Sequence, residues 1–468
     1  MAIYYPQAAM VLRVRWEDFA SKSKLLTDEY EIKVIPKKVR VFINSYREAD
    51  KFSCELDFKS FPFDPRSIRA LGVKIYMENM SEKLSQGVGF EALQIAPDDD
   101  KNLRFTGFAD EETLVMNDTT QMVSFEGRDF TSLFIDRPYV DKNGQRPPID
   151  LSQPIDVVFR KILAGLEEAK RMTVVNETGE KTLPTLSSIA PDFQDVLAGK
   201  KGTHKADKYW DVMQDIADRA GLIVYVYLDK LVISKPRVLY SGSKKKQFVY
   251  GLNLRSLEFK RKLGRMKGFN VEVRSMDFLN KSVGRVKVPE EASDAWIAKM
   301  GIPKAPVKIP RVNSTGVTEE TAAPYYVFTI PDIDSSTEAG RKHMVSIAEG
   351  VYESVSRQEI EGELETRDML ISEDGKPFDV TKIKNGTPVE IYISKDDLHE
   401  VTNMSDQGKR AAYLKAHGYA PKVADALAST LGKFMNVFYT RAAELGIDEK
   451  GFTCKLQFIN FLEAPRKK

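Results

Sequence analysis

Hydrophobic and polar residues alternate over much of the first 138 residues of the chain. Val39, Val41 and Ile43 alternate with polar residues, turn-forming residues occupy 45–51, and the alternation resumes over 52–58. Because successive side chains of a strand point to opposite faces of a sheet, this pattern predicts a hairpin with one buried face. Similar alternation predicts further strands at 73–77, 103–108 and 122–126.

The pattern changes to helical spacing between residues 147 and 222. Apolar residues recur three and four positions apart over 155–166 and again over 210–220, and Gly221 is a natural helix end. Two short apolar runs, 222–227 and 231–233, then flank a turn. This section is therefore expected to be two amphipathic helices with a hairpin packed behind them.

Strand periodicity returns after residue 250, where Val271 and Val273 alternate with polar residues. The proline-rich stretch 301–324 predicts a long loop, and Ser335 with Glu338 forms a capping box that opens a helix. A polar helix is expected within 405–431, whereas 434–442 fits either a helix or a strand by periodicity alone. Further strands are expected at 358–366, 388–394 and 452–462.

Length and composition indicate a chain of several packed domains. The 468 residues, 42% of them hydrophobic, suggest about three domains. No run of about 18 apolar residues occurs, so we expect no membrane anchor and synthesis in a cytoplasm. Cys54 and Cys454 alternate in phase with apolar neighbours, and we interpret both as core residues of strands rather than as disulfide partners or catalytic thiols.

Charge is segregated along the chain although the net charge is only +2. Residues 200–270 contain 17 Lys and Arg against 6 Asp and Glu, whereas residues 331–380 contain 13 acidic against 5 basic residues. The basic stretch 260–267 could contact phosphates, but it lacks the interleaved aromatic residues of a nucleic-acid motif. We interpret it as a solvated face or a protein contact.

Local signatures of catalysis and of metal binding are missing from the sequence. The four histidines, at 204, 343, 399 and 417, are too scattered for a local metal or nucleophile–base pattern. The sequence contains no HExxH, no CxxC, no phosphate-binding Gly-Lys-Ser/Thr loop and no Gly-x-Ser-x-Gly elbow. We therefore expect no catalytic residue, no metal site, no cofactor and no enzymatic activity.

Gly127, Arg128 and Asp129 form a candidate structural motif between a predicted strand and the segment 130–135. Glycine permits a reversal of the chain, and Asp129 is suited to cap a short helix. The alternative is an anion site built on Arg128. We favour the capping role, because such caps are common at helix starts.

Glu359, Glu361, Glu363 and Glu365 occupy alternate positions of a predicted strand. On a strand all four carboxylates share one face, and a ladder of like charge has to stay wet or be paired. One interpretation is an ordinary solvent face with Lys or Arg across the strand pair. The other is the lumen-facing wall of a pore that repels passing DNA.

Several segments resemble, in order along the chain, parts of one family: the baseplate hub proteins of contractile phage tails, which include the late control D-like proteins. The segment 125–138 resembles the strand-to-helix junction that closes their first barrel, and 209–236 resembles their helix–hairpin module. The segment 259–277 resembles the opening of their second barrel, and 451–462 resembles their closing strand. This resemblance favours a strand at 434–442, paired with 452–462.

The resemblance implies an α+β, mostly β fold, with two tail-tube-like split β-barrels and a helix–hairpin middle domain. The expected domains are the first barrel at 1–138, the middle domain at 139–250 and the second barrel at 251–468. The second barrel would carry the long loop 301–324 and the helical insertion 405–431.

The function that the resemblance implies is that of a structural hub in the virion tail baseplate. Three copies would supply six barrels, which match a sixfold tail tube on one side and a threefold spike on the other. The expected partners are two further copies, the tail tube protein and the spike protein, with the tape measure protein and other baseplate components as further candidates. DNA would pass through the lumen without specific binding.

Two alternatives remain open at the level of sequence. The same architecture would suit the base of a type VI-like or phage-derived injection spike. The residues 463–468 end the chain soon after the last predicted strand, without a repetitive needle, so a separate spike protein is expected. A cell-wall hydrolase is the less favoured alternative, since it needs a cleft with paired carboxylates of shifted pKa.

Overall fold

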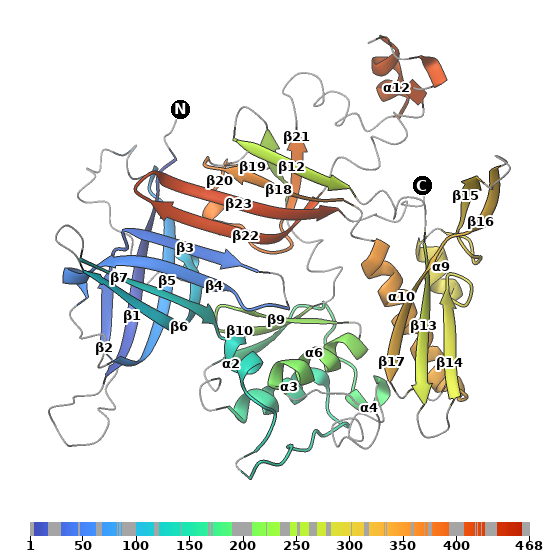
Figure 1. Cartoon of the computed structure of the whole chain (residues 1–468), viewed down its shortest axis with the longest axis horizontal. Helices are drawn as coiled ribbons and strands as arrows, with labels where there is room; N and C mark the ends of the chain where they lie inside the picture. The colour runs from blue at the N-terminus through green and yellow to red at the C-terminus, as the bar shows by residue number, and fades with distance from the viewer. Residues whose placement is uncertain are drawn as a thin grey trace.

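The computed structural model divides into a large sheet, a helical unit beside it and a smaller sheet with its own helices (Figure 1). The first and last strands of the chain lie together in the large sheet, whereas the smaller sheet occupies one end of the molecule (Figure 1). The structure describes residues 4–16, 30–44, 47–61, 68–81, 83, 86, 100–116, 121–141, 143–166, 169, 172–189, 208–220, 222–234, 244–249, 253–261, 269–277, 282–300, 302–312, 318–331, 333, 335–356, 360–368, 370–372, 377–392, 407–416, 418, 420–422, 424–425 and 438–460.

The first half of the large sheet has the strand order β2-β1-β5-β6-β7-β4-β3, and every neighbouring pair is antiparallel. The strands that the alternating pattern predicted at the start of the chain are confirmed here. The bounds are β1 (Pro6–Trp16), β2 (Tyr30–Val34), β3 (Lys38–Ile43), β4 (Lys51–Asp57), β5 (Ile68–Asn79), β6 (Leu103–Met116) and β7 (Gln121–Asp129), with short 3-10 helices at Phe58–Ser60 and Asp100–Asn102.

The second half joins the first through β3, which pairs with a strand from near the end of the chain. Ala443 to Ile447 of β22 lie opposite Ile43 to Val39 of β3. From β22 the sheet continues through β23 and β18 to β12, and also through β21, β11, β19 and β20. The bounds are β11 (Lys246–Val249), β12 (Ser256–Arg261), β18 (Ile360–Thr366), β19 (Leu370–Ser372), β20 (Pro377–Phe378), β21 (Pro388–Tyr392), β22 (Phe438–Asp448) and β23 (Gly451–Asn460).

One hydrophobic core lies under both halves of the large sheet. Phe52 and Phe125 from the first half belong to the same buried cluster as Phe438, Leu445 and Phe458 from the second. Full burial of each such side chain contributes about 1.5–3 kcal/mol. The predicted fold class, mostly β with two barrel-like halves and a helix–hairpin unit, is confirmed.

The helix–hairpin unit follows the first half directly. Its core contains Phe134, Phe159, Trp210 and Ile216, and its three-stranded sheet has the order β8-β10-β9. The two amphipathic helices and the hairpin predicted for this section are confirmed, and the pattern gave no sign of β8. The bounds are α2 (Thr131–Asp136), α3 (Ile155–Ala164), β8 (Thr173–Asn176), α4 (Leu186–Ile189), α6 (Tyr209–Arg219), β9 (Ile223–Tyr227) and β10 (Lys230–Ser234).

The third unit departs from the expected second barrel. The strand that the resemblance placed at the opening of that barrel, β13, pairs with β14 and β17 in a separate three-stranded sheet. α10 packs on β13 and β14, and Phe269, Trp296 and Met344 belong to a core of its own. The bounds are β13 (Asn270–Asp277), β14 (Ser282–Val288), α9 (Asp294–Met300), β17 (Tyr325–Pro331) and α10 (Glu338–Ser356).

Two other predictions for the last part of the chain have different outcomes. The prediction of a loop at 301–324 was wrong in part, because β15 (Lys308–Val312) and β16 (Thr318–Ala322) form a hairpin there. The strand favoured at 434–442 is confirmed, since β22 begins at Phe438 and pairs with β23.

A helix, α12 (Gln407–Ala416), lies within the predicted helical insertion, much of which falls outside the described residues. None of the helices that the structure describes is long and apolar enough to cross a membrane.

Candidate functional site

The junction between β7 and α2 is held by a close approach of backbones at Gly127. A Cβ atom at this position would lie 2.7 Å from Cε1 of Phe52 and 2.8 Å from Cα of Ala109, and closer still to the carbonyl oxygen of Phe108. Gly107 on β6 meets the backbone of Arg128 in the same way. The two glycines therefore let β6 and β7 pass one another just where the pairing of the two strands shifts register.

Arg128 lies between two carboxylates on the surface of this junction. Its guanidinium donates to Asp110 on β6 at 2.7 and 3.2 Å and to Asp136 on α2 at 2.7 and 3.4 Å. Hydrogen bonds to both carboxylates raise the pKa of Arg128. Because its two donor edges already face carboxylates, the arrangement favours a clamp between strand and helix over an anion site.

Asp129 is buried, with 4% of its surface exposed. Its carboxylate accepts hydrogen bonds from the backbone N–H and from the hydroxyl of Thr131, both at 3.0 Å, at the first turn of α2. Burial raises the pKa of Asp129 to about 7. The pKa of Asp50 is also raised, by burial and by the charge of Asp129, although the Asp50 carboxylate accepts from the N–H of Asn44 at 2.7 Å.

We predict that Asp129 makes the stability of the protein depend on pH. The folded pKa of about 7 lies above that of an unfolded aspartate, about 4, so the favourable contribution is complete below about pH 4 and is lost as pH rises through about 7. In urea unfolding, Asp129→Asn should gain free energy of unfolding relative to the wild type as pH increases from about 5 to about 8.

The control for this prediction is Asp150→Asn, which changes an exposed aspartate whose pKa is lowered by hydrogen bonds from Ser152. A lowered pKa contributes stability that is lost only as pH falls through the folded value, so this variant should show no trend between about pH 5 and about pH 8. An Asp129→Asn difference that stays constant over the same interval would contradict the prediction.

The described residues of the turn between β3 and β4, 44 and 47–50, join all three parts that meet at this junction. The backbone N–H of Asp129 donates to the carbonyl of Asp50 at 3.0 Å, and Nε1 of Trp210 on α6 donates to the carbonyl of Arg47 at 3.1 Å. From the second half of the large sheet, Nδ2 of Asn385 donates to the carbonyl of Asn44. This turn therefore fixes the two halves and the helical unit in one arrangement.

The acidic residues of β18 lie on one face of the large sheet. Leu364 and Thr366 are buried on the opposite face, so Glu361, Glu363 and Glu365 point away from the core. The fourth glutamate of the predicted ladder, Glu359, lies outside the described residues.

Cations stand opposite two of these glutamates. Lys260 on β12 lies opposite Glu361, and Lys455 on β23 lies opposite Glu365. Glu363 is different, because its neighbours across the two strand pairs are Glu258 and Gln457. Lysines on the neighbouring strands thus partly neutralise the negative charge of this face, but no cation lies directly opposite Glu363.

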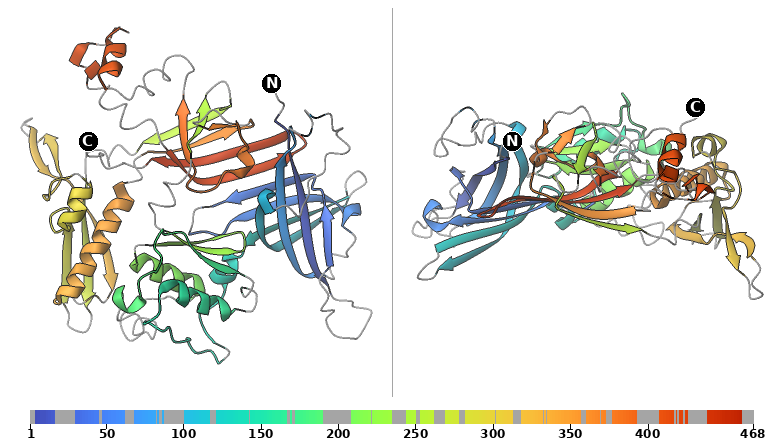
Figure 2. Two further views of the ribbon diagram at one scale, coloured as in Figure 1. Left: turned by 180° about the vertical axis from the view of Figure 1, so that it is seen from behind. Right: turned by 90° about the horizontal axis from the view of Figure 1, so that it is seen from above.

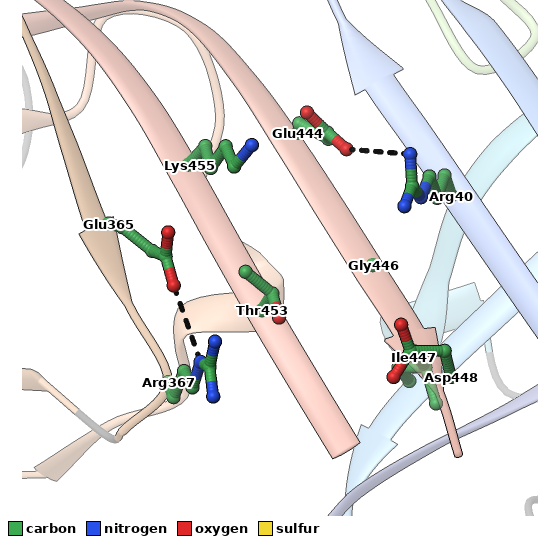
Figure 3. Close-up of a pocket in the computed structure, with 9 residues that line it drawn as sticks. All are labelled: Arg40, Glu365, Arg367, Glu444, Gly446, Ile447, Asp448, Thr453 and Lys455. Atoms are coloured by element: carbon green, nitrogen blue, oxygen red, sulfur yellow. Dashed lines mark hydrogen bonds and ion pairs between the residues drawn. The ribbon is translucent and has the colours of Figure 1, made fainter. Parts of the chain in front are cut away.

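The same face has a hollow of about 230 Å³ over β3, β22, β23 and β18 (Figure 3). Arg40 pairs with Glu444 at 3.7 Å and Arg367 with Glu365 at 3.3 Å, as the dashed lines in Figure 3 show. Further along the sheet, Lys38 pairs with Glu55 at 2.6 Å. The hollow is thus lined by alternating charges, which suits a polar contact with another protein better than a small apolar ligand.

Residues that could hold a metal or act as nucleophiles do not gather among the described residues. No group of three or more His, Cys, Asp and Glu side chains is placed to hold a metal ion in the described part of the chain. Cys54 and Cys454 are buried and not bonded to each other, and burial raises the pKa of Cys54 to about 12. Of the four histidines, His343 on α10 is described, whereas the other three fall outside the described residues.

Two features of this region were missed by sequence reasoning. Asp50 was not singled out; the only signal for it in the sequence is that aspartate is common in turns, where its side chain bonds backbone groups. The ion pair between Arg40 and Glu444 joins residues about 400 positions apart, and no local pattern predicts it.

No family model and no curated protein matches this sequence. Among solved structures, the tail protein from Neisseria meningitidis MC58 matches with a TM-score of 0.52 and 10% identity over 98% of each chain. The 43 kDa tail protein of prophage MuSo2 from Shewanella oneidensis matches with a TM-score of 0.48 and 12% identity over 98% of this chain and 99% of that one.

A third match is the E. coli c3393 protein, described as a type VI secretion component similar to the T4 tail proteins gp27 and gp5. Its TM-score is 0.42, with 6% identity over 92% of this chain and 75% of that one. Of these three structures, the Neisseria tail protein alone matches with a TM-score above 0.5. At 10% identity, that likeness shows the fold.

Proposed function

We propose that this chain is a structural protein of a phage-type tail and acts as the hub of its baseplate. The observation that carries the proposal is the likeness to the Neisseria tail protein, which extends over 98% of both chains. The earlier resemblance of short segments to tail hub proteins points the same way. Nothing in this role requires catalysis, a metal or a cofactor.

The architecture supports a role between rings of different symmetry. Each chain carries two barrel-like halves joined edge to edge through β3 and β22. Three chains would present six such halves to a sixfold tail tube and a threefold surface to a separate spike protein, and a closed ring would cover edges that are open in one chain. We propose a homotrimer in this position, with DNA passing through its lumen.

The domain division proposed for this hub keeps the boundaries 1–138, 139–250 and 251–468. Within the third domain, the strands β11, β12 and β18 to β23 belong to the large sheet. The unit that contains β13, β14, β17 and α10 then becomes an insertion in the second barrel. Such an insertion leaves the barrel intact, because β12 and β18 pair directly across it.

The proposed lumen-facing residues are Glu361, Glu363 and Glu365, together with Glu359. Replacing all four by Gln removes the acidic ladder without changing side-chain size. If this face lines the channel, tails assembled with the variant should form normally but release DNA more slowly, because the wall no longer repels phosphates. DNA release is measured by dye uptake after triggering, and an unchanged rate would place the ladder outside the channel.

The experiment that tests the hub itself combines native mass measurement with electron microscopy of assembled particles. We expect a mass of three chains and density for the chain where the tail tube meets the spike. A chain that stays monomeric both alone and in particles, or lies elsewhere in the particle, would overturn the proposal. Density at the base of a spike in a particle without a genome would identify an injection machine instead.

A further inference from the structure

Two open strand edges of opposite charge lie at opposite ends of the molecule. One is the outer part of β6, and the other is β14, one of the two outer strands of the small sheet (Figure 1). Figure 2 (right) shows the β6–β7 hairpin running out to the end of the molecule that is far from the small sheet. Because the two edges of one chain are so far apart, each is placed to meet another molecule.

The acidic edge arises because β5 separates from β6. The pairing of β5 with β6 ends at Gly72 and Phe108, whereas β6 stays paired with β7 as far as Met116. Residues after Phe108 therefore present one open edge among the strands that the structure describes. Leu114 and Val115 on this edge are exposed by 42% and 41%.

The charges of the acidic edge are unbalanced. Within the described residues 109–116 and 121–126, four residues are acidic, Asp110, Glu111, Glu112 and Glu126, and none is Lys or Arg; Arg128 pairs with Asp110, which leaves three acidic residues in excess. Glu111 lies directly opposite Glu126 across the hairpin, and both are exposed. Like charges directly opposite each other destabilise a strand pair, so this edge would gain from a cationic neighbour.

The basic edge has the converse pattern. β14 pairs with β13 alone among the described strands, and Val283 on it is 50% exposed. β14 (Ser282–Val288) contains Arg285 and Lys287 and no acidic residue, and just beyond it Glu291 accepts a hydrogen bond from the backbone N–H of Lys287 at 3.0 Å. Arg285 is exposed and lies directly opposite Arg274 of β13, a pair of like charges in which Arg274 is also paired with Glu272 at 2.6 Å.

We propose that the acidic edge of β6 in one copy of this chain docks on the basic edge of β14 in the next copy. The edges match in three respects: each is an open strand edge, each exposes aliphatic side chains, and their excess charges are opposite. Pairing would satisfy open backbone groups along both edges, apart from the N–H and carbonyl of Lys287 that already bond Glu291, and would cover Leu114, Val115 and Val283.

Such a contact is heterologous, because it joins different surfaces of identical chains. Repeated head to tail it gives either a closed ring or an open filament. The inference rests on the proposed homotrimer, and it assigns the contact that closes the three-copy ring.

The test is a pair of single charge reversals, E111K and R285E. E111K places a cation opposite Glu126, and R285E places an anion opposite Arg274, so each relieves a repulsion within the chain. The thermal stability of the isolated chain should therefore be unchanged or higher, whereas each variant should raise the concentration at which half the protein is assembled by roughly tenfold or more.

The double variant E111K/R285E exchanges one charge between the two edges and should restore assembly toward the wild-type concentration range. A matched control is Glu449→Lys, which makes the same charge change at the exposed turn between β22 and β23, on neither of the two edge strands. This control should leave assembly unchanged. Mass photometry over a dilution series measures the four variants and the wild type.

A second measurement places the edges directly. The variant V115C/V283C, treated with a short bis-maleimide, should form covalent species of up to three chains. The native Cys54 and Cys454 should not react, because they are only 2% and 0% exposed. V115C and V283C alone should not yield the three-chain species.

A three-copy wild type whose assembly is unaffected by both reversals, and which forms no such crosslink, would overturn this contact and leave the proposed hub intact. Failure of the hub proposal would be seen instead in the wild type, as a chain that remains single alone and in particles.

Discussion

Gly127→Ala should lower the free energy of unfolding by about 3 kcal/mol, near the upper end for overpacking a protein interior. The added Cβ would lie 2.7 Å from Phe52 and 2.8 Å from the Cα of Ala109, and closer still to the carbonyl of Phe108. Two of these three contacts are with backbone atoms, which cannot rotate away. The strands β6 and β7 would have to separate at the junction that positions α2. Chemical denaturation followed by circular dichroism measures the loss.

The matched control is Gly350→Ala in α10, where a Cβ would have no atom within 4 Å. In a helix interior this change removes backbone freedom from the unfolded chain and should stabilise by up to about 1 kcal/mol. The two substitutions are chemically identical, so opposite signs would attribute the effect to the close approach at Gly127. Equal effects at the two sites would show that the approach at Gly127 relaxes at no cost.

Phe438→Ala should destabilise the protein by about 3–5 kcal/mol, the range for large cavities in a core. Phe438 is 1% exposed, and its ring lies 5.0 Å from that of Phe458 and 5.7 Å from that of Phe259. Because one core serves both halves of the large sheet, the first half should lose stability together with the second. Hydrogen exchange at the amides of β4 and β7 measures this transmitted effect.

The control for Phe438→Ala is Phe328→Ala on β17, whose side chain is 42% exposed. Its removal should cost far less, and it should leave the exchange rates of β4 and β7 unchanged. If Phe438→Ala accelerated exchange in β22 and β23 alone, the two halves would be independent folding units despite their shared core.

Strands with one buried face could be predicted from the sequence, because a period of two is imposed by the core itself. This is why the hairpin of β3 and β4 and the strands β5 to β7 agree with the alternating pattern. The same pattern cannot say which sheet a strand joins. Val271 and Val273 alternate as they would in a barrel, yet their buried face packs on α10 in a separate sheet.

The prolines of 301–324 led to the prediction of a loop, which was wrong in part because β15 and β16 lie there. Pro310 lies inside β15, where a two-stranded hairpin leaves an open edge that needs no N–H donor. The charged face of the large sheet is harder to predict, because the residue opposite Glu365 and the ion-pair partner of Glu444 lie on other strands. Alternation predicted that the glutamates of β18 share a face, but their neighbours depend on the order of strands.

The pairing of β3 with β22 also has a consequence during synthesis on the ribosome. β3 ends at Ile43 and β22 begins at Phe438, about 395 residues later. At about 5–20 residues per second, roughly 20–80 s of translation separate the two strands. Throughout that interval the nascent N-terminal half exposes an unfinished strand edge and part of its apolar interior, so newly made chains should need chaperones until their last hairpin emerges.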